Sequence, residues 1–343
     1  MEQLANTLYV MTPGAYVRLD HETVKVEVEG TTQIQIPLHH LGGVICCGNV
    51  LVSPGVIHKC AEDGRFVVML DSIGRFKARV VGPTSGNVLL RCAQHEAMHN
   101  KEQTISIARN IVAGKIKNTR TVLLRGARET KDITDQTVLR KAASRLGQAV
   151  TALDQQNNLD VIRGIEGEAA RTYFATIEYL ILVDRDIFRP NGRTRRPPRD
   201  YLNALLSFLY ALILSDCVAA AEGVGLDPQV GFLHAIRPGR PALALDLMEE
   251  FRVILGDRVA ITLINRRQIT PKHFEERPGG SVYLNDSGRR KVAVAYQKRK
   301  QEKITHPLLE HSKPIALIPH IQARLLARTL RGDLEQYPPF IYR

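Results

Sequence analysis

The first 88 residues alternate between apolar and polar side chains with the two-residue period of half-buried β-strands. The alternation is clearest over residues 24–28 and 33–36, and it predicts two strands there. Short apolar runs over residues 43–46 and 66–70 predict two further strands, which are expected to be more deeply buried than the first two. A brief helix is expected after Ser53. Residues 1–88 are therefore predicted to form a small β-rich domain.

From about residue 89 onward, apolar residues recur with the period of amphipathic helices. The predicted helices cover residues 96–112, 137–153, 167–182, 201–221 and 242–255. The most hydrophobic stretch, 204–221, is interrupted by Ser207, Ser215 and Asp216 and is shorter than the roughly 20 apolar residues of a membrane span. It predicts a buried helix, with no membrane involved. The chain is therefore predicted to be α+β, with a larger, mainly α-helical domain over residues 89–343.

The charge of the chain is strongly basic and unevenly distributed. The 343 residues hold 47 Lys and Arg against 35 Asp and Glu, a net charge of +12. Residues 1–100 hold 8 basic and 9 acidic side chains, which leaves 39 and 26 for residues 101–343. A polyanion-binding surface is therefore expected in the second part.

Five cysteines in no disulfide-scaffold pattern favour a reducing compartment, and the N-terminus shows no secretory signal, so we expect a cytoplasmic protein.

Arginines are concentrated in residues 189–199, where five occur among eleven residues. Prolines and a glycine exclude a helix there and predict an exposed, flexible loop. Its guanidinium groups are suited to bidentate phosphate contacts, although a solvated linker would have the same composition. Two further basic clusters, 289–291 and 298–300, flank a strand-like segment, 292–296. Because the first cluster follows the turn signal 285–288, a hairpin is expected.

Cys92, His95 and His99 have a C-x2-H-x3-H spacing that superficially suits zinc on one helix face. No fourth ligand is evident nearby in the sequence. Ordinary positions at a domain junction remain the better interpretation of these three residues.

A second set of residues suits a divalent metal. Glu166 lies in the Gly-Ile-Glu-Gly segment 164–167, which is expected to be a tight turn that opens a helix, with the glutamate in its first turn. His234 follows an apolar step, and Asp246, Glu249 and Glu250 crowd into one helical turn. Three acids so close together repel one another, and a metal would relieve that repulsion. A helix-start glutamate and a core histidine without chemistry are the alternatives.

Four ordered segments carrying these residues resemble a known family. They are residues 163–171 (RGIEGEAAR), 197–207 (PPRDYLNALLS), 231–234 (GFLH) and 243–252 (LALDLMEEFR). The sequence resembles the CRISPR-associated integrase of the spacer-acquisition machinery, the larger, endonuclease-like subunit, and most of all its type I-C branch. The resemblance covers nearly the whole chain.

The resemblance implies a catalytic helical domain whose metal, Mn²⁺ or Mg²⁺, is bound by Glu166, His234 and Glu249, with Asp246 as an additional acidic residue near the site. Which of Asp246 and Glu250 joins Glu249 is left open. The implied reaction is attack of a DNA 3′-hydroxyl on a phosphodiester, by which short foreign DNA is inserted as a new spacer into a CRISPR array. The DNA contacts expected from the arginine-rich loop are those of Arg193, Arg195, Arg196 and Arg199.

The implied partners are double-stranded DNA, as protospacer and CRISPR repeat, a second copy of the chain that dimerises through the β-rich domain, and a small second adaptation subunit. Two other functions fit the same residues. One is a metal-dependent nuclease for branched or single-stranded DNA, which differs only in using water as the attacking group. The other is a DNA-binding scaffold without chemistry.

Overall fold

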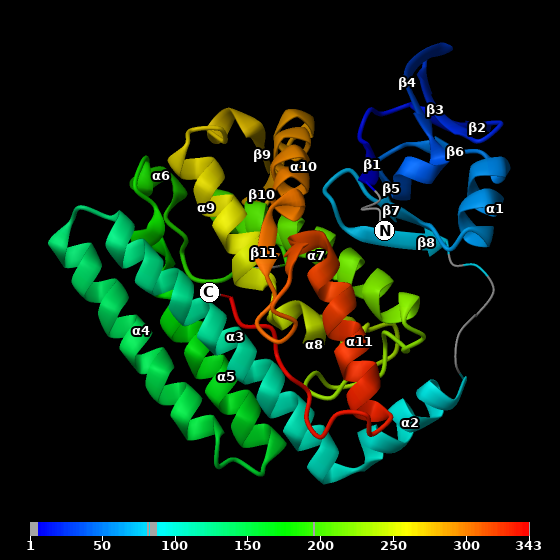
Figure 1. The fold of residues 1–343 in the computed structure, drawn as a ribbon. Helices are drawn as coiled ribbons and strands as arrows, with labels where there is room; N and C mark the ends of the chain where they lie inside the picture. Colours follow the sequence, from blue (N-terminus) through cyan, green and yellow to red (C-terminus); the bar gives the residue numbers. More distant parts are fainter. Residues whose placement is uncertain (1–5, 81, 83–87, 195, 343) are drawn as a thin grey trace.

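The computed structural model describes residues 6–80, 82, 88–194 and 196–342. A β-rich N-terminal region is followed by a larger, mainly helical region (Figure 1). This confirms the predicted α+β fold class. The first helix of the second region begins at Val88, next to the boundary predicted from the sequence.

Two four-stranded sheets form the N-terminal region, with strand orders β4-β3-β2-β6 and β1-β5-β7-β8. In the second sheet β1, β5 and β7 are parallel, and β8 is antiparallel to β7. The elements of this region are β1 (Asn6–Val10), β2 (Tyr16–Asp20), β3 (Thr23–Val28), β4 (Thr31–Pro37), a 3₁₀ turn (Leu38–His40), β5 (Leu41–Cys47), β6 (Leu51–Val52), α1 (Pro54–Glu62), β7 (Phe66–Leu70) and β8 (Phe76–Val80).

The two kinds of strand differ in sequence because they are covered differently. In β3, Val24 and Val26 are buried and their neighbours Thr23, Lys25 and Glu27 are only partly buried, as the alternation predicts. β5 is apolar almost throughout because both of its faces are covered. Val44 lies in the small core of the N-terminal region, whereas Ile45 lies in the large core shared with the helices. The second sheet therefore joins the two parts of the molecule.

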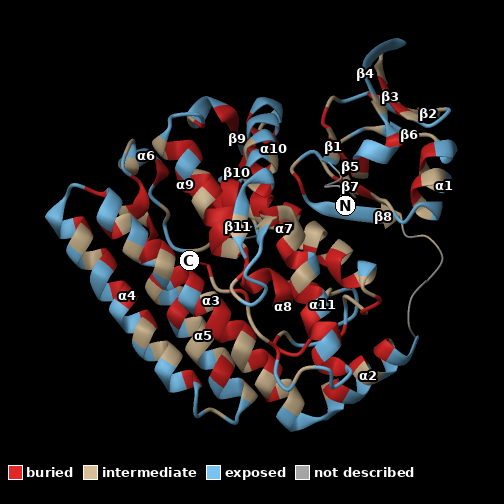
Figure 2. Cartoon of the chain, viewed as in Figure 1, coloured by how far each residue is buried: buried red, intermediate tan, exposed pale blue. Residues whose placement is uncertain are grey.

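The helical region surrounds the apolar helix α7 (Figures 1 and 2). Its elements are α2 (Val88–His99), α3 (Lys101–Glu129), α4 (Ile133–Leu153), α5 (Leu159–Phe174), a 3₁₀ turn (Ile177–Leu180), α6 (Arg185–Phe188), α7 (Tyr201–Gly223), α8 (Ala242–Glu249), the π-helical segment η3 (Arg252–Asp257), α9 (Arg258–Asn265), a 3₁₀ turn (Pro271–His273), β9 (Phe274–Arg277), β10 (Ser281–Leu284), α10 (Asp286–Gln301), β11 (Lys303–Thr305), β12 (Ser312–Pro314), a 3₁₀ turn (Ile315–Leu317) and α11 (Ile318–Leu330).

Helix α7 is long and apolar enough to cross a membrane by length and composition alone. In the structure it is a core helix instead. Leu205, Leu209 and Ile213 are fully buried among the surrounding helices. This is the buried helix that the interrupted apolar stretch predicts.

Several predicted helices have different bounds in the structure: the one expected over 137–153 begins at Ile133, and the one expected over 242–255 ends at Glu249 and is followed by the π-helical segment η3. Two others differ more. The helix expected over 96–112 is divided at Asn100, whose side chain accepts a hydrogen bond from the Gln103 amide at 3.1 Å and caps α3. The helix expected over 167–182 begins eight residues earlier, at Leu159, and ends at Phe174. In both cases an asparagine marks the true start, because its side chain satisfies amides that the first turn leaves unpaired.

The predicted hairpin at residues 285–296 is wrong. Asn285 caps helix α10 by accepting from the Gly288 amide at 3.0 Å, and residues 292–296 lie within that helix. An asparagine with a following glycine suits both a turn and a helix start, and the local sequence does not distinguish them. The hairpin of this region, β9–β10, lies immediately before Asn285.

Gly74 is a point of close approach between the two regions. It has φ +82° in the turn between β7 and β8, and a Cβ atom there would overlap the ring of Phe208 in α7. We expect Gly74→Ala to lower the free energy of unfolding by about 1–2 kcal/mol through left-handed backbone strain and by a further ~1–3 kcal/mol through overpacking. Gly64→Ala is the matched control, since Gly64 has φ +66° with no described heavy atom within 4 Å of its Cβ position. If urea unfolding gave the same loss of unfolding free energy for Gly74→Ala and Gly64→Ala, the close approach to Phe208 would be contradicted.

Candidate metal centre

Glu166, His234 and Glu249 meet at a small cavity of about 120 Å³ between α3, α5, α8 and η3. Each comes from a different part of the sequence, and each lies at the cavity wall. The Nε2 atom of His234 is 3.7 Å from Oε1 of Glu249. Glu249 is almost fully buried, whereas Glu166 and His234 are partly exposed. The structure thus brings together the three side chains that the sequence indicates as metal ligands.

Glu166 lies in the middle of α5 rather than in its first turn. Asn158 caps this helix by accepting from the amides of Asp160 and Val161 at 2.8 and 3.3 Å. The expected turn at residues 164–167 is therefore wrong, and the helix dipole does not explain the glutamate. Glu166 instead shares one helix face with Ala169 and Tyr173, and all three residues line the cavity.

Asp246 positions His234. One of its oxygens, Oδ2, accepts from the amides of Phe232 and Leu233 at 2.6 and 2.9 Å, and Oδ1 accepts from the amide of His234 at 2.9 Å. The ring atom Nδ1 of His234 lies 2.7 Å from the same Oδ1. A carboxylate acceptor places the ring proton on Nδ1 and leaves Nε2 available toward Glu249. Asp246 itself is fully buried and does not line the cavity.

Lys115, on α3, lies between two of the carboxylates. Its Nζ forms an ion pair with Oε1 of Glu166 and lies 2.7 Å from Oε2 of Glu249. Among the described residues no group of three or more His, Cys, Asp or Glu side chains is placed to hold a metal ion. The ammonium nevertheless marks a position that favours a cation. Two carboxylates contact it, and the imidazole Nε2 of His234 lies 3.7 Å from one of them, so the chemistry of this donor set fits Mn²⁺ or Mg²⁺.

Arg252 completes the charge balance around Glu249. Its Nη2 lies 2.9 Å from Oε1 of Glu249, one helical turn away. Burial would raise the pKa of Glu249, but the positive charges of Arg252 and Lys115 oppose it and hold this pKa at about 2. Glu249 is therefore an anion at every physiological pH.

Glu250 points away from the cavity. Its carboxylate accepts from the Tyr337 hydroxyl at 2.6 Å, the Phe340 amide at 2.7 Å and the Gln322 side chain at 3.0 Å. Burial raises the pKa of Glu250 to about 8, although these hydrogen bonds oppose the shift. Glu250 thus holds the C-terminal segment, and neither it nor Asp246 lines the cavity beside Glu249.

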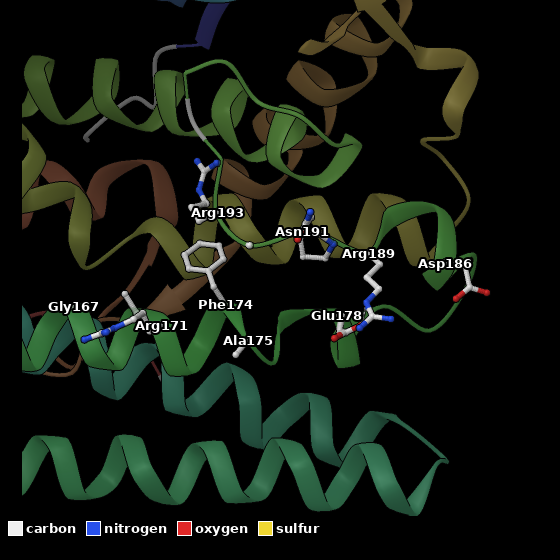
Figure 3. Close-up of a pocket in the computed structure, with 12 residues that line it drawn as sticks. Gly167, Arg171, Phe174, Ala175, Glu178, Asp186, Arg189, Asn191 and Arg193 are labelled. Carbon is white, nitrogen blue, oxygen red and sulfur yellow. Dashed lines mark ion pairs between the residues drawn. The ribbon is translucent and has the colours of Figure 1, made fainter. Parts of the chain in front are cut away.

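A second cavity of about 890 Å³ adjoins the first and shares Ala170 and Phe174 with it. One wall is α5, and the other is the segment 189–193 of the arginine-rich loop (Figure 3). Arg189 forms an ion pair with Glu178 at 2.8 Å across this cavity. The loop therefore borders an open space next to the cavity of the three candidate ligands.

The arginines of this loop have different roles. Arg193 is not exposed as predicted: it donates to Oδ1 of Asn203 at 2.7 Å, and its guanidinium lies over the rings of Phe174 and Tyr210 at 5.9 and 5.3 Å. Arg196 and Arg199 are exposed, and Arg195 lies outside the described residues. The Pro198 carbonyl accepts from the Val282 amide at 2.9 Å, which fastens the loop to β10.

The alternative zinc residues Cys92, His95 and His99 all lie exposed on α2. Within the described part of the chain, they belong to no group of three or more side chains placed to hold a metal. The structure thus gives no support to a zinc site there.

Sequence reasoning missed Lys115 and Arg252. Arg252 follows Glu249 by three residues, a spacing that brings opposite charges together on a helix, so this ion pair had a detectable signal. Lys115 had only its position among apolar residues of α3 as a signal. Its contacts depend on packing between helices far apart in the sequence.

Comparison with known proteins places the chain in a family. Residues 8–298 match the family model described as CRISPR associated protein Cas1. The chain is 60% identical over 343 residues to the CRISPR-associated endonuclease Cas1 1 of Moorella thermoacetica, with all of both chains covered. It is 46% identical over 347 residues to the CRISPR-associated endonuclease Cas1 2 of Rhodospirillum rubrum, again with full coverage of both. The chain belongs to the Cas1 family.

Two solved structures share its fold. A chain of "Casposase bound to integration product" has a TM-score of 0.84 at 22% identity, with 98% of this chain and 94% of that chain covered. A chain of "Cas6-RT-Cas1--Cas2 complex" has a TM-score of 0.83 at 23% identity, with 99% of this chain and 36% of that chain covered. At these identities the likeness concerns the fold.

The low pKa of Glu249 makes a contribution to stability that depends on pH. The folded value of about 2 lies below the ordinary 4.5, so the contribution is present above pH 4.5 and is lost as the pH falls toward 2. The shift corresponds to about 3 kcal/mol. We expect Glu249→Gln to destabilise the protein in urea unfolding with EDTA at pH 6.5, and the difference from wild type to narrow by about 1 kcal/mol at pH 3.5. Glu168→Gln, which changes an exposed glutamate, is the control. If the loss of unfolding free energy in Glu249→Gln were the same at both pH values, the ion pairing of Glu249 would be contradicted.

Proposed function

We propose that the chain is a metal-dependent DNA integrase and endonuclease that inserts short foreign DNA segments as new spacers into a CRISPR array. The observation that carries the proposal is the meeting of Glu166, His234 and Glu249 at one cavity, where the two glutamates share a cation and His234 lies beside Glu249. The names of the endonuclease relatives and the casposase with its integration product support it. Family membership alone would not assign the chemistry, because activity depends on the site.

Glu166, His234 and Glu249 would hold Mn²⁺ or Mg²⁺ through carboxylate oxygens and Nε2. When bound, such an ion lowers the pKa of an attacking hydroxyl and stabilises charge on the phosphate and the leaving oxygen. Asp246 keeps Nε2 of His234 directed at the site, and Arg252 keeps Glu249 ionised and in place. With a DNA 3′-hydroxyl as the attacking group the product is joined DNA, and with water it is cleaved DNA.

The DNA strand would approach along the 890 Å³ cavity beside the arginine-rich loop. Arg196 and Arg199 do not line this cavity but are exposed farther along the same loop, where they could contact phosphates, and Arg195 stays a predicted contact. Arg193 holds the loop in position by stacking on Tyr210, which itself lines the metal cavity. Its removal would therefore alter the loop and the site together, whereas removal of Arg199 would weaken phosphate binding alone.

The proposed partners are double-stranded DNA, a second copy of this chain bound through the β-rich region, and a small second subunit. The structural neighbour from a complex that contains Cas1 and Cas2 supports the second subunit. We place the protein in the cytoplasm, where CRISPR arrays and invading DNA are both present.

The first test of the proposal is transfer of a short labelled duplex into supercoiled plasmid, with Mn²⁺, Mg²⁺ or EDTA, and with and without the small subunit. We expect Glu166→Gln and His234→Ala to lower metal-dependent joining at least a hundredfold, because each removes a ligand, and to leave duplex binding within about twofold. The control is Glu168→Gln, on the exposed face of the same helix.

The outcomes separate the three functions. Joining retained in both site variants would remove the proposed site. Nicking without joining would favour a nuclease for branched or single-stranded DNA, and binding without any metal-dependent chemistry would favour a scaffold.

Lys115 is expected to compete with the metal. Its ammonium lies between the same two carboxylates, so the two cations exclude each other. Loss of a unit charge this close to a divalent ion should strengthen Mn²⁺ binding by Lys115→Met about tenfold or more, measured by electron paramagnetic resonance of free Mn²⁺. Without metal, Lys115→Met should unfold at a lower temperature than the metal-free wild type, since the two carboxylates then lack the ammonium counterion. Lys117→Met, which removes an exposed charge two residues away, is the control, and weaker Mn²⁺ binding by Lys115→Met would contradict competition.

A further inference from the structure

A third cavity, of about 1070 Å³, lies between α9, α10, the segment after α10 and the C-terminal Tyr342. In Figure 1 these elements lie side by side near the C-terminus. None of the described residues that line it lines the metal cavity. It is therefore a separate feature of the surface, which we call the α9–α10 groove.

The charge of this groove is strongly positive. Its described lining holds eight Lys or Arg side chains and two Glu side chains. Of the basic residues, Lys291 and Lys298 are exposed on one face of α10. They are seven residues apart, which is about 10.5 Å along a helix. Uncompensated charge of one sign in a concave surface concentrates the potential that attracts an anion.

At the centre of the groove two arginines share one phenol. The guanidinium groups of Arg258 and Arg299 lie over the ring of Tyr342 at 5.3 and 6.0 Å. Both also donate to its hydroxyl, Arg299 at 3.3 Å. Arg299 has an acidic partner in Glu302, whereas Arg258 has no carboxylate within 4 Å among the described residues. For Arg258 the counterpart is therefore a neutral hydroxyl, which is a weak one.

The ionisation of these groups reflects the crowding. Burial lowers the pKa of Arg258, and the neighbouring charges of Arg299 and Arg125 lower it further, with Tyr342 in opposition. Burial would raise the pKa of Tyr342, but the hydrogen bond from Arg299 and the charges of Arg258, Arg299 and Arg125 lower it. An anion bound between these arginines would relieve their mutual repulsion.

We propose that the α9–α10 groove binds the phosphate backbone of single-stranded DNA. A guanidinium pair suits a phosphate, and the stripe of lysines on α10 extends the positive surface beyond the reach of a single phosphate group. A positive groove that follows a backbone is typical of single-strand binding sites. The choice of DNA as the polyanion rests on the proposed function, but this contact needs neither the metal nor its ligands. It gives the protein a second hold on the DNA, remote from the candidate site.

The experiment measures binding of a fluorescein-labelled oligothymidylate of 20 nucleotides by fluorescence anisotropy, in EDTA and at several salt concentrations. Lys291→Gln/Lys298→Gln changes exposed residues and leaves Arg258, Arg299 and Tyr342 intact. We expect at least fivefold weaker binding at 0.1 M salt. The slope of log affinity against log salt should fall in magnitude by about 1.4, that is ~0.7 for each phosphate that the variant no longer neutralises. Arg258→Gln/Arg299→Gln should weaken binding further, with folding checked by circular dichroism.

The control, Arg128→Gln/Arg331→Gln, removes the same charge at two exposed positions outside the three cavities, and its slope should stay within about 0.3 of wild type. Equal slopes for the groove and control variants would overturn the proposal. If the groove variants weakened binding of a duplex as much as binding of oligothymidylate, the single-strand assignment would be overturned. If they weakened binding of pyrophosphate but left oligothymidylate binding unchanged, the groove would be a site for free phosphate instead. Glu166→Gln in the same assay separates the two proposals, because it should bind normally even where joining is lost.

Discussion

The structure depends on how helix α8 buries three carboxylates within about one turn. Asp246, Glu249 and Glu250 are all nearly inaccessible to solvent. Removing a charged group from water costs several kcal/mol unless partners compensate for it. Each carboxylate has its own partners: Asp246 has the His234 loop, Glu249 has Lys115 and Arg252, and Glu250 has the C-terminal segment. The requirement to compensate the charges of Asp246 and Glu249, and to hydrogen-bond the buried carboxyl group of Glu250, therefore fixes three separate parts of the chain around one short helix. Mutual repulsion among the acids, which the sequence suggests a metal would relieve, is already reduced by this separation.

The same constraint extends to the cationic side chains. Arg252 reaches Glu249 from the π-helical segment η3, and its guanidinium lies 5.1 Å from the ring centre of Tyr210. Tyr210 donates to Asp257 at 2.6 Å, and Arg193 from the arginine-rich loop lies over the same ring. The loop is thus connected to Glu249 through one aromatic ring. A change at Arg193 would be transmitted to the candidate site without any contact between Arg193 and the DNA.

What could be predicted from the sequence was whatever depends on local pattern. Alternation identified strands such as β3, continuous hydrophobicity identified β5 as covered on both faces, and the interrupted apolar stretch identified α7 as a core helix. The failures arose where one local signal suits two structures. Gly164 and Gly167 lie within a helix although glycine is a poor helix former, because tertiary packing of α5 outweighs their preference for a turn. Asn285 begins a helix instead of closing a hairpin.

The candidate site shows the same division. Its three proposed ligands were identified from ordered motifs, but the roles of the adjacent acids were not separable from spacing alone, since Asp246 and Glu250 both lie within reach of Glu249 on a helix. Only long-range contacts distinguish them. The amides of residues 232–234 donate hydrogen bonds to Asp246, whereas the Tyr337 hydroxyl and the Phe340 amide donate to Glu250. Lys115 depends on the packing of α3 against α5 and α8, for which the sequence carries no local signal.

Net charge also proves to be a coarse guide to where DNA would bind. Arg79, Arg252, Arg289 and Lys300 contribute to the basic total but are largely buried, and each contacts an acidic side chain. Their charges stabilise the fold and are not offered to a ligand. The useful quantity is positive charge that the protein itself leaves without an acidic counterpart. By that measure the α9–α10 groove stands out, because the partly buried Arg258 has, among the described residues, no counterpart stronger than the phenol of Tyr342. Compensation by a bound phosphate would resemble what the acids of α8 receive from the chain itself.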